Sequence, residues 1–133
     1  DHKPIAFGAN CGVGSSDLLR TIKSFINKDI KIIAKGNAGI PKFKGGKIVY
    51  DGTPEIMAKY ACYARDLGAS IIGGCCGTTP LHIREMKKSL SENLTLREIS
   101  LDMIEDCFGK FSSKSDSSRV KDTSKNKRRR RVH

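Results

Sequence analysis

The 133-residue sequence predicts an α/β domain in which short parallel strands alternate with helices. Three apolar runs, in "KPIAFGANC", "DIKIIAKG" and "ASIIGG", have the composition of strands, and a segment with helical spacing of apolar residues follows each of them. Strands that alternate with helices of this length are typical of parallel β/α units. The runs are continuously apolar, which we expect of a sheet covered on both faces.

The first two units are bounded by glycine and proline. The first apolar run ends near Gly8, and Ser15 or Ser16 is the predicted N-cap of the helix "DLLRTIKSFINK". The second strand is predicted over 30–34. Glycines and Pro41 end it, and we expect "KFKGGKIVYDG" to be a polar loop.

The later helices have clear start signals. A threonine followed by proline opens a helix well, and this pair occurs at Thr53 and again at Thr79. The helix after Thr53 should end at Gly68, where the third strand begins. A fourth helix is predicted from about Thr95 to residue 106, because Thr95 and Glu98 have the spacing of a capping box.

Three strands complete neither of the two parallel folds that this order allows, a doubly wound sheet and a (β/α)₈ barrel. Either the chain is part of a larger domain, or its open strand edges pair with another chain, which allows a homo-oligomer. The chain begins at Asp1 without a methionine, and we favour a fragment.

The net charge of +11 lies mainly in the C-terminal tail. Residues 111–133 hold nine Lys/Arg and two Asp, which gives +7, so the body carries only +4. The tail is Ser, Lys and Arg with almost nothing apolar, and we predict that it is disordered. Its "KNKRRRR" could contact phosphates, but no aromatic residue follows Phe111 to stack bases, so we do not expect a nucleic-acid binder. No apolar stretch is long enough to span a membrane.

Cysteine usage favours a reduced, cytoplasmic protein. The count is five, without regular spacing, which argues against a secreted disulfide framework. We expect Cys62 to be a buried apolar residue on a helix and Cys107 to be inert.

The other three cysteines follow strands. Cys11 follows the first strand, and Cys75 and Cys76 follow the third. Because the carboxyl ends of parallel strands share one rim, these thiols should converge there. Three thiolates with one open position are the ligand pattern of a catalytic zinc site. Glycines on both sides of the pair allow the kink that turns both sulfurs to one ion. Simple packing and a disulfide between Cys75 and Cys76 remain the alternatives.

Other polar residues near this rim have simpler explanations. Asn37, just after the second strand, could reach an ion with its side-chain oxygen, but it is also a typical turn residue, as is Asn10. We expect His82 to be a surface or capping residue rather than a fourth ligand. The segment "GVGSS" lacks the lysine of a phosphate-binding loop.

The motifs "FGANCGVG", "AKGNAGIP", "YDGTPEIMAKYA" and "GASIIGGCCGTTPLHI" resemble the C-terminal part of the homocysteine S-methyltransferase family over residues 4–90. The resemblance implies a TIM barrel, with these units as its strands six to eight. It also implies that Cys11, Cys75 and Cys76 hold Zn²⁺, and that Asn37 is a possible fourth ligand before substrate arrives. The family's usual proline before this asparagine is Gly36 here.

The resemblance implies an enzyme of methionine biosynthesis, in which zinc lowers the pKa of the homocysteine thiol so that the thiolate can attack an activated methyl group. The ending of the chain is similar to short bacterial betaine–homocysteine methyltransferases, so betaine is the expected donor. The barrel of a cobalamin- and methyltetrahydrofolate-dependent methionine synthase is the alternative, and a structural zinc module is an alternative of another class.

The expected organisation is therefore the C-terminal part of a homocysteine-binding barrel over 1–94, an appended helix over 95–110 and the tail over 111–133. The residues that bind the amino and carboxylate groups of homocysteine are expected in earlier strands. We do not expect this chain to be active alone.

Overall fold

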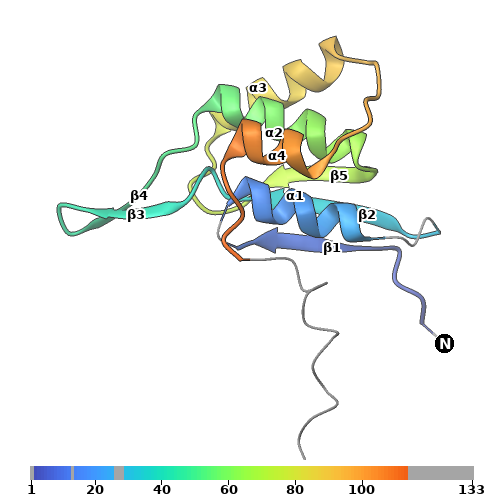
Figure 1. The fold of residues 1–133 in the computed structure, drawn as a ribbon, viewed down its shortest axis with the longest axis horizontal. Helices are drawn as coiled ribbons and strands as arrows, with labels where there is room; N and C mark the ends of the chain where they lie inside the picture. The colour runs from blue at the N-terminus through green and yellow to red at the C-terminus, as the bar shows by residue number, and fades with distance from the viewer. Residues whose placement is uncertain (1, 13, 26–28, 114–133) are drawn as a thin grey trace, which may run out of the picture.

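The computed structural model describes residues 2–12, 14–25 and 29–113, and its centre is a three-stranded parallel sheet (Figure 1). Strands β1 (Ala6–Cys11), β2 (Lys31–Gly36) and β5 (Ala69–Gly74) lie in the order β1-β2-β5. Both pairs are parallel, and the register places Cys11 beside Gly36 and Gly36 beside Gly74. The predicted parallel α/β class and its three strands are confirmed.

Helices cover one face of this sheet. Helices α1 (Ser15–Ser24) and α2 (Pro54–Asp66) pack against the strands, α3 (Pro80–Glu92) packs along α2, and α4 (Leu101–Phe108) packs against α1 (Figure 1). Apolar side chains between the helices and the sheet form the core. Those that are fully buried include Leu19, Ile22, Ala34, Met57, Tyr60 and Ala61.

The expectation of a sheet covered on both faces is wrong for the described residues. Along β2, buried and more accessible side chains alternate, and Ile71 of β5 is 46% exposed. A parallel sheet with one covered face is consistent with part of an α/β barrel.

The predicted starts of α2 and α3 are confirmed. The hydroxyl oxygen of Thr53 accepts a hydrogen bond from the Ile56 N–H at 3.3 Å, and Pro54 occupies the first turn, where no N–H is needed. Helix α2 ends before Gly68, which has a φ of +104°.

The predicted cap of α1 is wrong. Gly14 occupies the N-cap position, and no side chain caps the helix. Ser15 and Ser16 lie inside the first turn, where both are buried.

Most of the polar loop expected over 42–52 is a β-hairpin that projects from the body (Figure 1). Strands β3 (Pro41–Lys44) and β4 (Lys47–Tyr50) are antiparallel, with Phe43 opposite Ile48. Gly45 and Gly46 both have positive φ, at 54° and 76°, as the commonest two-residue hairpin turn requires. This turn, with strand-forming residues on both sides, explains the hairpin.

The last helix begins later than predicted. Ser100, not Thr95, is its N-cap, and its hydroxyl oxygen accepts from the Met103 N–H at 3.2 Å. The segment before it is held against α2, since the Arg97 Nε donates to the Asp66 carboxylate at 3.0 Å.

Much of the basic tail, including "KNKRRRR", lies outside the described residues, so its predicted disorder stays a prediction. Among the described helices, none has the length and apolar character needed to cross a membrane.

Candidate metal centre

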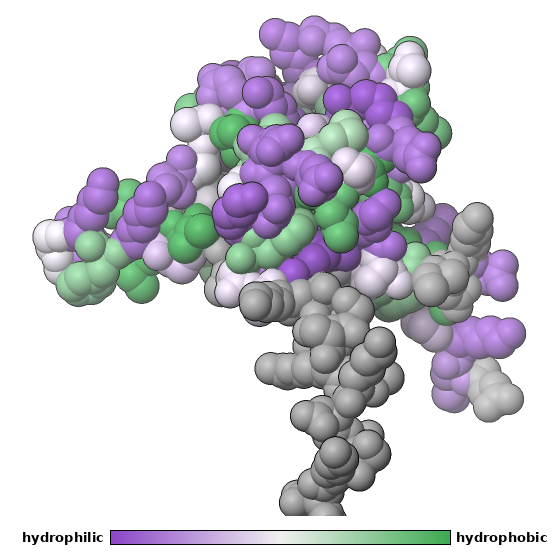
Figure 2. Space-filling view, in the orientation of Figure 1, coloured by the Kyte–Doolittle hydropathy of each residue, from purple (hydrophilic) through white to green (hydrophobic). Residues whose placement is uncertain are grey.

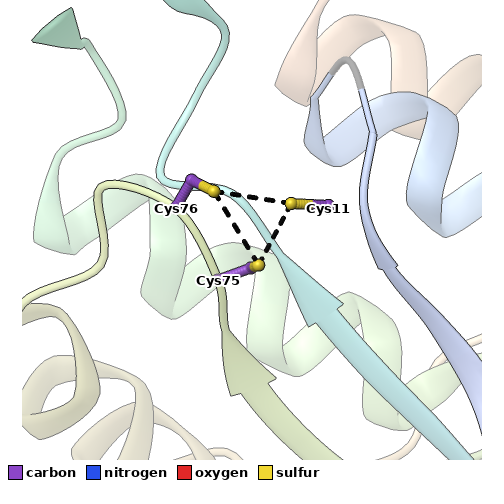
Figure 3. A group of neighbouring side chains, drawn as sticks. All are labelled: Cys11, Cys75 and Cys76. Carbon is purple, nitrogen blue, oxygen red and sulfur yellow. Dashed lines mark hydrogen bonds between the residues drawn. The ribbon is translucent and has the colours of Figure 1, made fainter. Parts of the chain in front are cut away.

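Three thiols meet at the carboxyl edge of the sheet. Cys11 is the last residue of β1, and Cys75 and Cys76 follow β5, with the end of β2 between them. The Cys11 sulfur lies 3.1 Å from that of Cys75 and 3.5 Å from that of Cys76, and the neighbouring pair is 4.0 Å apart (Figure 3). The convergence expected from the strand order is therefore present.

The backbone around the thiols adopts conformations that ordinary residues avoid. Cys11 has a φ of +61°, the one positive φ outside glycine in the described part of the chain. Holding such a residue there costs on the order of 1–3 kcal/mol, and strain of this kind concentrates at functional sites. Gly77 has a φ of +76°, so the glycine after the cysteine pair supplies the bend predicted for it.

Gly36 connects this corner to the protein core. Its N–H donates to the hydroxyl of the fully buried Tyr60 at 2.9 Å, and its carbonyl accepts from the Cys75 N–H at 2.8 Å. A Cβ at Gly36 would lie 3.0 Å from the Tyr60 ring, tighter than nearly all real contacts. The position between the thiols therefore favours glycine in this chain.

Asn37 links the two cysteine loops. Its side-chain Oδ1 accepts from the Cys76 N–H at 3.1 Å, and its Nδ2 donates to the Gly12 carbonyl at 3.0 Å. The side chain is only 3% exposed. A carbonyl oxygen has two lone pairs, so the Cys76 contact leaves one acceptor site free.

The three neighbouring thiols shift one another's pKa values. Hydrogen bonding with Cys75 and Cys76, followed by partial burial, raises the pKa of the Cys11 thiol to about 11. The pKa of Cys75 is lowered, first by its contact with Cys11, then by Cys76, with a smaller contribution from the Asn10 side chain. Asn10, expected only as a turn residue, therefore lies beside the thiols.

The three sulfur atoms lie within 4.8 Å of one another and could hold a metal ion. A tetrahedral zinc with Zn–S bonds of about 2.3 Å places its sulfur ligands about 3.8 Å apart. The observed separations of 3.1, 3.5 and 4.0 Å are close to this spacing. Soft thiolate donors in this number suit zinc, so the residues fit the ion.

The remaining candidates lie elsewhere. The Nδ1 of His82 accepts from the Thr79 N–H at 3.0 Å, and its Nε2 lies 2.7 Å from the Gly52 carbonyl, so His82 caps α3 as expected. Cys62 is buried, with its sulfur 3.2 Å from the Ser89 hydroxyl. Neither Cys62 nor Cys107 belongs to the cluster.

One contact of the site was not predicted from the sequence. Tyr50, at the end of β4, lies beside the cysteine pair, and the neighbouring Cys76 thiol is the main cause that raises the pKa of the Tyr50 hydroxyl. The signal that could have suggested this contact is the alternation of Phe43, Ile48 and Tyr50 on a strand pair, and it was missed because residues 42–52 were expected to form a loop.

A comparison with protein-family models matches residues 1–90 to the family described as homocysteine S-methyltransferase. The matched region contains both cysteine loops and ends inside α3. The match covers more than half of the 133 residues. The chain therefore belongs to the homocysteine S-methyltransferase family.

Proposed function

We propose that the protein transfers a methyl group to the thiol of homocysteine, giving methionine, at a zinc site formed by Cys11, Cys75 and Cys76. Membership of the homocysteine S-methyltransferase family indicates methyl transfer to homocysteine. The observation that carries the zinc proposal is the convergence of three sulfurs from two strand ends at 3.1–4.0 Å.

A zinc ion held by three protein thiolates would take the substrate thiol as its fourth ligand and lower that thiol's pKa, which supplies a thiolate nucleophile at neutral pH. The chain's part is to hold the sulfurs in place. Gly36 fixes the backbone of Cys75, and Asn37 fixes the backbone of Cys76 and of the loop after Cys11. Because these bonds exist without the ion, little reorganisation is needed when the ion binds.

Before homocysteine binds, Asn37 is our candidate for the fourth ligand. Its Oδ1 already lies beside the cysteine loops, and its second lone pair is available while the first accepts the Cys76 N–H. An amide oxygen is a weak ligand for zinc, so an incoming thiolate would displace it readily.

We further propose that the three β/α units are units six to eight of a closed barrel, with residues 1–94 as its C-terminal part and 95–110 as an addition. The exposed face and the two free edges of the sheet support this, since the other strands of a barrel would cover them. Betaine is the proposed donor, supported by the resemblance of the serine- and arginine-rich ending to betaine-dependent members.

The test is methionine formation by the zinc-loaded full-length protein. We expect methyl-labelled betaine to label methionine, and methylcobalamin and S-methylmethionine to fail as donors. Cys76→Ser should abolish labelling, while Cys107→Ser, the matched control outside the cluster, should retain it. Equal activity in both variants would refute the proposed site. Activity with methylcobalamin instead of betaine would refute the proposed donor alone.

A further inference from the structure

The β3–β4 hairpin has one apolar and one basic face. Paired residues of antiparallel strands share a face, and successive residues alternate. One face therefore carries Pro41, Phe43, Ile48 and Tyr50, and the other carries Lys42, Lys44, Lys47 and Val49. Figure 2 shows apolar and polar side chains next to each other along this projecting arm. Tyr50, at the base of the apolar face, is half-buried against the core.

The Tyr50 ring lies directly on the loop that carries the cysteine pair. A Cβ added to Gly77 would lie only 2.4 Å from Cγ of Tyr50 and 2.7 Å from its Cδ2. A side chain at position 77 would collide with the Tyr50 ring, so the ring can approach this closely only because residue 77 is glycine. Gly77 directly follows Cys76, so the ring lies against the backbone beside that thiol, and Cys76 is the main cause that raises the pKa of the Tyr50 hydroxyl.

We propose that Tyr50 is a positioning residue of the metal centre, which places Cys76 and donates a hydrogen bond from its hydroxyl to the Cys76 sulfur. Cys76 is the most exposed of the three thiols, so its sulfur has the least protein around it to fix its direction. This inference rests on the proposed metal site, and it makes the hairpin part of that site.

A hydroxyl that donates to a metal-bound thiolate has two measurable effects. It holds the ligand in its binding orientation, and loss of such an outer contact typically weakens metal binding about 10- to 100-fold. It also withdraws electron density from the sulfur, so the sulfur-to-metal charge-transfer absorption lies at higher energy. The second effect depends on the hydrogen bond itself, and a residue that only packs would not produce it.

The experiment is Co²⁺ titration of the full-length protein, in which the Tyr50→Phe variant is compared with the wild type. We expect Co²⁺ affinity to fall about tenfold, and the thiolate-to-cobalt band to move to longer wavelength. Tyr63→Phe is the matched control, because Tyr63 lies near Cys107, a thiol outside the cluster, and its ring packs on Phe108. It should change neither quantity.

A second variant keeps the ring and the fold. With 3-fluorotyrosine at position 50, the more acidic hydroxyl is a stronger donor, so the band should move to shorter wavelength. Circular dichroism reports whether each variant is folded. If Tyr50→Phe does not fold, the band position of the fluorinated protein alone tests the inference. An unchanged band in the folded variants, or an equal change in Tyr63→Phe, overturns the inference while leaving the metal site intact. A wild-type protein without any thiolate-to-cobalt band overturns the metal site and this inference together.

Discussion

Asn37→Ala tests whether one side chain holds the two cysteine loops together. The substitution leaves the Cys76 N–H and the Gly12 carbonyl without their partner at a position that is 97% buried in the wild type. Each buried polar group left unpaired costs about 1–3 kcal/mol. Both bonds are only partly shielded from water, so we expect a loss of about 2–4 kcal/mol in the free energy of unfolding.

The assay is urea denaturation followed by circular dichroism, with linear extrapolation to water. The matched control is Asn93→Ala, which removes an exposed asparagine bonded to Ser89 and should cost less than about 1 kcal/mol. Asn37→Asp retains an acceptor for Cys76 and loses the donor for Gly12, so its cost should lie between those of the other two variants. An Asn37→Ala protein as stable as Asn93→Ala would refute the role assigned to Asn37.

Three further predictions follow from the same contacts. Tyr60→Phe should cost about 1–3 kcal/mol at pH 7, because the buried Gly36 N–H loses its acceptor. Burial raises the pKa of Tyr60, so its stabilising contribution is complete below pH 10 and is lost as the pH rises above that value. The stability difference between wild type and Tyr60→Phe, measured by urea denaturation, should therefore shrink above pH 10 by up to about 1.4 kcal/mol per pH unit, and a constant difference would contradict this. Gly8→Ala should prevent stable folding, since its Cβ would lie 1.9 Å from the Ile33 carbonyl oxygen. The Cβ of Gly45→Ala meets no other atom, so this variant should lose only the stability that backbone strain in the turn removes. Thermal unfolding of the two variants compares these effects. If Asn37 is the fourth ligand, Asn37→Ala should alter the Co²⁺ spectrum without homocysteine and leave the spectrum with homocysteine unchanged.

The parts of the fold that local chemistry determines could be predicted from the sequence. The Thr-Pro pairs at Thr53 and Thr79 predicted two helix starts, because a capping oxygen and a proline act within one turn. The convergence of Cys11 with Cys75 and Cys76 followed from strand direction alone, since parallel strands end at the same edge.

Features that depend on tertiary contacts could not be predicted in this way. The start of α4 was misplaced because the Arg97–Asp66 ion pair holds the preceding segment against α2, although Thr95 and Glu98 have capping-box spacing. The approach of Tyr50 to Cys76 depends on how the hairpin meets a loop 26 residues further along the chain, which no local pattern encodes.

The central claim is that three sulfurs from two strand ends hold one ion and leave a position for the substrate thiol. X-ray absorption at the zinc edge of the zinc-loaded full-length protein tests it most directly. We predict three sulfur ligands at about 2.3 Å and one lighter ligand, with a fourth sulfur replacing the lighter one when homocysteine is added. Fewer than three sulfurs, or a spectrum that homocysteine does not change, would contradict the account.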